Sequence, residues 1–294
     1  MTAFSYQLYS SRNFPPLADT LTMLADLGYA EVEGYGALYA DPALVSELKT
    51  HLGASGLTMP AGHFGLQMLE SDVDAVLSIA REVGMQRLYC PHLAAEERPD
   101  SGADYEAFGR RLAEAARPYR DAGLGFGWHN HDFEVRPTAD GAVPLDAIFS
   151  GGPDLEWEAD IAWVIVGGAD PLALIDTHGG RISAVHIKDI APHGEALDEG
   201  GWADVGHGTV DWPRLLAALK QTKVRHFILE HDRPKDPERF ATRFGASDSM
   251  AFSRPPSRLP ASGASGRARR APSSASRNSA GRGSRVASSA RSPR

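Results

Sequence analysis

Short apolar runs alternate with amphipathic stretches along most of the chain. The run ISAVHIKD (182–189), for example, is followed by a polar loop and then by DWPRLLAALKQT (211–222), whose apolar positions recur at helical spacing. Proline, aspartate or serine stands near the start of the amphipathic stretches, and glycine follows many of them, as is typical of helices. The pattern predicts strands that alternate with helices.

The pattern repeats eight times before residue 244. The predicted strands are 4–10, 30–36, 57–64, 86–93, 124–131, 154–163, 182–189 and 226–232. The predicted helices are 15–29, 41–56, 71–84, 104–123, 143–151, 170–180, 211–222 and a short one from 236. Eight such units, each of about 30 residues, are the content of an α/β (β/α)8 TIM barrel. We therefore expect residues 1–243 to form one barrel domain.

The periodicity stops at residue 244, inside the last predicted helix. Residues 244–294 are rich in Ser, Arg, Ala, Gly and Pro, which predicts a disordered tail. The tail holds ten Arg and one acid, a net charge of +9, while residues 1–243 hold 20 basic and 37 acidic residues, a net charge of −17. Because a domain boundary seldom falls inside a helix, one hypothesis is that the tail is a frameshifted extension.

Composition narrows the class of protein. A single cysteine, Cys90, excludes an internal disulfide or a cysteine-based zinc ribbon. The N-terminus has no signal-peptide pattern, and no apolar run approaches the length of a membrane span, so we expect a cytoplasmic protein without a membrane partner. Residues 1–243 are acidic and would repel the phosphates of a nucleic acid. The basic tail is therefore the only segment that we expect could bind nucleic acid.

Polar residues close most of the predicted strands. In a TIM barrel these carboxyl ends form the active-site face. The residues at or near them are Glu33, His63, His92, His129, His131, Asp132, Glu134, Glu158, Asp160, His186, Lys188, Asp189, Glu230, His231 and Asp232.

Four of these residues come from four consecutive strands, namely Glu134, Asp160, His186 and Glu230. Three carboxylates and one imidazole make an oxygen-rich site for one divalent metal, which suits Mn²⁺, Co²⁺ or Mg²⁺ and is also compatible with Zn²⁺. The other residues have alternative interpretations. His92 is more often structural at such a position, and His231 and Asp232 suit a solvated rim.

Five motifs resemble the sugar phosphate isomerase/epimerase family, the xylose-isomerase-like TIM barrels. They are HNHDFE (129–134), EADIAWVIVGGADP (158–171), HIKD (186–189), ADVGHGTVDW (203–212) and ILEHD (228–232), and the resemblance covers about residues 4–243. It implies the metal ligands Glu134, Asp160, His186 and Glu230. Many relatives end strand five with Glu where this chain has His129, so His129 is the alternative fifth-strand ligand. The glycine-rich loop reads Gly206-His207-Gly208 instead of Gly-Glu-Gly.

The resemblance implies an isomerase or epimerase that acts on a ketose, inosose or related polyol through an enediolate. Glu230 and Glu134 are then the candidate acid and base, with His129 as a further candidate. Glu33, His63, His131, Trp163 and Lys188 are the candidate substrate-binding residues.

Other functions stay open at this point. The same site in a sugar or inosose dehydratase would expel a β-hydroxyl. An endonuclease-IV-like repair enzyme would need a trinuclear zinc site and a basic DNA face, which the body's charge disfavours. An inactive barrel with a nucleic-acid-binding tail is a fourth possibility, and homo-oligomerisation is expected from the resemblance alone.

Overall fold

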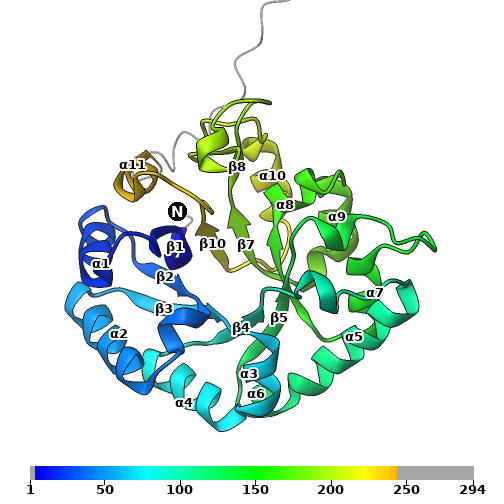
Figure 1. The fold of residues 1–294 in the computed structure, drawn as a ribbon, viewed down its shortest axis with the longest axis horizontal. Coiled ribbons are helices and arrows are strands. Elements are labelled where there is room, and N and C mark those ends of the chain that lie inside the picture. Colours follow the sequence, from blue (N-terminus) through cyan, green and yellow to red (C-terminus); the bar gives the residue numbers. More distant parts are fainter. Residues whose placement is uncertain (1–3, 244–294) are drawn as a thin grey trace, which may run out of the picture. The chain divides into compact units, whose positions relative to one another are not determined.

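Eight parallel strands close into a barrel in the computed structural model, which describes residues 4–243 (Figure 1). The strand order around the ring is β1-β10-β7-β6-β5-β4-β3-β2, so the last barrel strand pairs with the first. The expected TIM barrel is confirmed. The predicted tail, residues 244–294, lies outside the described residues.

The barrel strands are short. They are β1 (Phe4–Gln7), β2 (Glu31–Gly34), β3 (Thr58–His63), β4 (Arg87–Cys90), β5 (Gly125–His129), β6 (Glu156–Asp160), β7 (Ile182–Ile187) and β10 (His226–Leu229). A small antiparallel hairpin, β8 (Asp189–Ile190) and β9 (Trp202–Ala203), follows β7.

Helices surround the barrel (Figure 1). They are α1 (Leu17–Asp26), α2 (Pro42–Ser55), α3 (Leu66–Ser71), α4 (Val73–Val83), α5 (Gly102–Ala115), α6 (Arg117–Asp121), α7 (Pro144–Gly151), α8 (Ile161–Val166), α9 (Pro171–His178), α10 (Trp212–Leu219) and α11 (Pro237–Arg243). Polar side chains cap several of them. Asp41 accepts from the backbone N–H of Ala43, and Ser101 from that of Asp104. Among the described residues no helix is long and apolar enough to cross a membrane.

The sixth strand ends earlier than its sequence pattern predicts. Residues 161–163 were expected to continue it, but they begin α8. Asp160 causes this change, because its Oδ1 accepts a hydrogen bond from the backbone N–H of Trp163 at 2.8 Å and caps the helix. The turn fixes Asp160 at the rim of the barrel.

Residues 189–210 form a folded loop around one buried carboxylate. The two oxygens of Asp189 accept backbone hydrogen bonds from Ile190, Gly206, Gly208 and Val210. A side chain at position 208 would collide with the Asp189 carboxylate, which explains the glycine there. The loop therefore has a defined conformation, and we call it the lid loop.

The barrel interior is closed below the carboxyl ends of the strands. Ala61, Tyr89, Ala184 and Ile228 form a small buried cluster, and the Tyr89 hydroxyl is hydrogen-bonded to Ser183 at 2.8 Å. A larger apolar core lies between the strands and the helices. The polar residues at the strand ends therefore lie directly above tightly packed side chains.

Candidate metal centre and substrate cavity

Titratable side chains from β2, β3, β5, β6, β7 and β10 converge at the carboxyl end of the barrel. Neighbouring strands place them in register, with His129 beside Glu158 and Asp160 beside His186. All are buried, and all except Glu33 fall into two overlapping groups that share His186.

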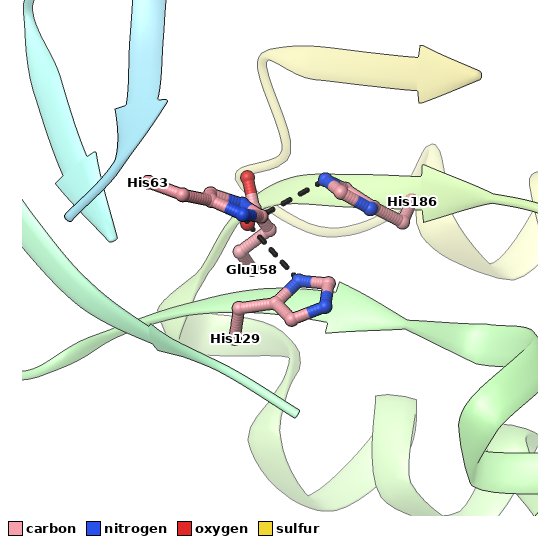
Figure 2. Close-up of side chains that lie close together, drawn as sticks. All are labelled: His63, His129, Glu158 and His186. Carbon is pink, nitrogen blue, oxygen red and sulfur yellow. Dashed lines mark hydrogen bonds and ion pairs between the residues drawn. The ribbon is translucent and has the colours of Figure 1, made fainter. Parts of the chain in front are cut away.

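The first group consists of His63, His129, Glu158 and His186 (Figure 2). Three imidazole nitrogens surround Glu158 Oε2, with His63 Nε2 at 2.5 Å, His129 Nδ1 at 3.0 Å and His186 Nε2 at 3.5 Å. The approach of His129 Nδ1 has the distance of an ion pair but not the angle of a hydrogen bond. We call these four residues the imidazole group.

The second group consists of Asp160, His186 and Glu230 and is called the carboxylate group. His186 Nδ1 lies 2.7 Å from Glu230 Oε2. The ammonium group of Lys188 lies 3.4 Å from Asp160 Oδ2 and 3.3 Å from Glu230 Oε2, and it donates to both oxygens of Asp232 at 2.8 Å. One internal cation therefore already faces this group.

At several of these residues, neighbouring charges together shift the pKa more strongly than burial does. Burial acts to raise the pKa of Glu158, but His186 and His63 hold that pKa well below its ordinary value. Burial likewise opposes ionisation of Glu230, but Lys188 and His186 lower its pKa. Burial disfavours the charged form of His186, yet Glu158 and Glu230 raise its pKa well above the usual range. These are the signs of paired buried charges.

At other positions burial decides the direction of the pKa shift. It lowers the pKa of His129 to about 3, with the charge of His186 adding to the effect, so the His129 imidazole is neutral at pH 7. Burial raises the pKa of Asp160 to about 6, against the opposing charge of Lys188.

The donor set fits a divalent ion. Among the described residues, Glu158 Oε1 and Asp160 Oδ2 are buried without a hydrogen-bond partner, although buried carboxylate oxygens are normally satisfied. Imidazole nitrogens and carboxylate oxygens are ligands that Zn²⁺, Mn²⁺ and Co²⁺ accept. This buried His/Glu cluster can therefore serve as a metal site.

A family model described as a xylose isomerase-like TIM barrel matches residues 21–255. The chain belongs to this family. The rhizopine catabolism protein MocC of Rhizobium meliloti is 27% identical over 244 residues, which cover 73% of this chain and 74% of MocC. This membership confirms the family that the motifs predicted.

Solved structures share the fold at low identity. A sugar phosphate isomerase/epimerase from Parabacteroides distasonis superposes with a TM-score of 0.69 at 17% identity, covering 86% of this chain and 94% of that one. The IOLI protein, solved with a zinc atom bound, superposes with a TM-score of 0.64 at 15% identity, covering 85% and 98%. The xylose isomerase-like barrel is thus shared with a protein that binds zinc.

The structure places Glu134 away from both groups. It lies in a 3-10 turn (Phe133–Val135) after β5, where Oε1 accepts from Trp128 Nε1 at 3.0 Å and Oε2 from the His131 backbone N–H at 2.9 Å. The turn directs the carboxylate toward the back of β5. The structure therefore does not bring Glu134 together with the other expected ligands, and Glu158 supplies the carboxylate among the imidazoles.

Glu33 also lies behind the site instead of lining it. Its Oε2 accepts from Gln7 Nε2 and contacts His186 Nε2, both at 2.7 Å, and its side chain is fully buried. The structure therefore places the Glu33 carboxylate against the ring of His186, and Glu33 is not among the residues that line the cavity.

A cavity of about 520 Å³ opens above the two groups. Six predicted site residues line it, namely His63, His129, His131, Trp163, Lys188 and Glu230. Trp202 of the lid loop packs edge-on against Trp163, with ring centroids 4.8 Å apart, and lies 4.6 Å from the Lys188 ammonium. The lid loop thereby holds two of the residues that line the cavity.

Three further lining residues, Tyr9, Arg12 and Tyr35, were missed in the sequence. They follow β1 and β2, whose ends carry few metal-ligand residue types. The signal that could have found them is the position of Arg12 just after the first predicted strand.

Proposed function

We propose that this chain is a divalent-metal-dependent isomerase or epimerase that acts on a ketose, inosose or related polyol through an enediolate intermediate. The observation that carries the proposal is the convergence of buried imidazoles and carboxylates, two of them with unsatisfied oxygens, beneath a cavity of about 520 Å³. Membership of the xylose isomerase-like family supports this proposal.

Asp160, His186 and Glu230 would hold the metal ion. When bound, the ion would polarise two adjacent substrate oxygens and so acidify the proton on the neighbouring carbon. The buried carboxylates favour a cation there, and Lys188 already supplies one positive charge to the same oxygens. The competing position for the ion is the imidazole group.

His129 is the proposed proton acceptor. Its Nδ1 lies 3.0 Å from Oε2 of the ionised Glu158 without forming a hydrogen bond of good geometry. Because His129 lines the cavity, Nε2 is the nitrogen that would meet the substrate carbon's proton. Glu158 would then stabilise the imidazolium that forms.

In an isomerisation His129 would return the proton to the adjacent carbon. In an epimerisation Glu230 would instead deliver a proton taken from solvent to the opposite face of the same carbon. His131, Lys188 and Trp163 line the same cavity and would hold the substrate's hydroxyl groups and its apolar face. His63 closes the inner side, where it contacts Glu158.

Elemental mass spectrometry of the purified full chain tests the proposal. We expect about one divalent ion per chain in the wild type, its loss in Asp160→Asn and Glu230→Gln, and its retention in the matched control Glu134→Gln. If His63→Ala loses the ion and Asp160→Asn retains it, the ion binds at the imidazole group instead. The absence of metal in the wild type, even after dialysis against Mn²⁺ or Zn²⁺, would refute the proposal.

A further inference from the structure

Tyr9, Arg12 and Tyr35 form the wall of the cavity at the ends of β1 and β2. In the closed strand order, β1 lies four positions from β5, so the two strands face each other across the barrel. This wall, which we call the arginine wall, therefore faces the end of β5 that carries His129 and His131.

Arg12 is held in position before any ligand binds. Its guanidinium carbon lies 3.7 Å from the centroid of the Tyr9 ring, and Nη1 donates to the Tyr9 carbonyl oxygen at 2.8 Å. The Tyr35 ring packs edge-on against Tyr9, with centroids 5.4 Å apart. Cation–π stacking is attractive, so the guanidinium is better ordered than a free surface side chain.

No carboxylate neutralises Arg12 among the described residues. The other permanent cation of the cavity wall, Lys188, is already paired with Asp232 and lies close to Asp160 and Glu230. Within residues 4–243, one of the five N–H groups of the Arg12 guanidinium donates a hydrogen bond, and the other four are left without an acceptor. Arg12 thus offers an oriented, uncompensated charge to whatever fills the cavity.

We propose that Arg12 binds a carboxylate of the substrate, so that the substrate is a sugar acid or another polyhydroxy carboxylic acid. An arginine can bind a carboxylate through two parallel hydrogen bonds. A phosphate dianion is less suitable, because Arg12 would be its one unpaired cation while Glu230 and Asp232 line the same cavity. This inference rests on the proposed function only in taking the cavity as the substrate site.

Binding of matched acid and neutral compounds to the full chain tests the inference. The probes are D-glucuronate with D-glucose, D-galacturonate with D-galactose, and D-gluconate with D-glucitol, measured by isothermal titration calorimetry. We expect at least one acid to bind about tenfold more tightly than its neutral partner, equivalent to about 1.4 kcal/mol, because hydrogen bonds between charged groups are stronger than those between neutral groups. Arg12→Gln should abolish this preference, and Arg12→Lys should restore part of it.

The matched control is Arg110→Gln, which removes an exposed arginine of α5 paired with Glu106 and should keep the preference. The inference is overturned if no acid is preferred over its neutral partner, or if Arg12→Gln retains the preference. Tighter binding of glucose-6-phosphate than of every acid would also overturn it.

Metal-stripped protein separates this inference from the proposed function. Because Arg12 belongs to neither metal-binding group, the acid preference should persist after chelation. A chain without a metal site that still prefers the acid would refute the proposed function alone. A metal-binding chain without the preference would refute the role of Arg12 alone.

Discussion

Glu158 and Asp160 show how two residues on one strand can have different roles. They are two positions apart on β6 and therefore face the same side of the sheet. Glu158 is surrounded by imidazoles, while Asp160 caps α8 and faces Lys188. The deeper residue is thus suited to supporting a base and the outer one to binding an ion.

The sequence located the site but not the direction of every side chain. It placed His129 and Glu134 at the same strand end, five residues apart, and only the 3-10 turn after β5 separates them into cavity and back wall. Such turns depend on local hydrogen bonds, here to Trp128 and His131, that residue types and spacing do not reveal.

Glu134→Gln tests this structural position. Both carboxylate oxygens accept hydrogen bonds, so the amide group of Gln would direct its own N–H groups at a donor from Trp128 or His131. We expect a loss of about 1–3 kcal/mol in the free energy of unfolding, measured by urea denaturation. Metal content should stay at the wild-type level, and a loss of metal at unchanged stability would contradict the assignment.

Cys90 provides a second test at this scale. The thiol is buried in β4, and burial raises its pKa to about 12. Because the thiolate is the reactive form, Cys90 should not react with a disulfide reagent at pH 8 in the native protein and should react fully in denaturant. Rapid labelling of the native chain would show that this part of the barrel opens.

At the scale of elements, the alternating pattern located all eight barrel strands. It extended the sixth strand to residue 163, whereas β6 ends at Asp160, because the residues IAW (161–163) are apolar enough for a strand while the Asp160 cap makes them the start of a helix. It also left residues 191–208 as a loop and so did not predict the β8–β9 hairpin. Both differences arise from side-chain hydrogen bonds to the backbone.

Ion pairs connect the lid loop to α11. Arg239 contacts Glu199 at 2.7 Å and the buried Asp204 at 2.9 Å, and Arg243 contacts Asp204 at 2.8 Å. Because Trp202 lies between these acids in sequence and packs on Trp163, the pairs help to position a side chain of the cavity wall.

Arg239→Ala should loosen the lid loop. Asp204 would keep a single partner, so we expect amide hydrogen exchange in residues 191–203 to accelerate about tenfold, equivalent to about 1.4 kcal/mol, while the barrel strands stay protected. Lys235→Ala is the matched control, because the pair of Lys235 with Asp198 is exposed and contributes little. Equal exchange in both variants would argue against the role of Arg239.

At the scale of the whole molecule, the barrel concentrates negative charge. Glu33, Glu158, Asp160 and Glu230 are all buried near one end, in a segment whose net charge is −17. A bound divalent ion would offset part of the repulsion among these carboxylates, and any ligand that binds only the folded state stabilises it.

Chelation should therefore lower the melting temperature. An ion at about one hundred times its Kd stabilises by about 2.7 kcal/mol, which corresponds to a shift of roughly 5–10 °C for a domain of this size. Differential scanning calorimetry before and after treatment with EDTA measures it, and Mn²⁺ or Zn²⁺ should reverse it. Asp160→Asn should show no shift, and an unchanged melting temperature in the wild type would contradict a structural contribution from the ion.

The pairing of β1 with β10 has a consequence for biosynthesis. The first strand finds its partner only after residues 226–229 have been translated, which at about 5–20 residues per second takes on the order of ten to fifty seconds. Glu230 follows directly, so one wall of the metal centre is among the last parts of the barrel to leave the ribosome. We therefore expect a divalent ion held by Asp160, His186 and Glu230, as proposed, to bind the nascent chain only near the end of translation, however early Asp160 and His186 emerge.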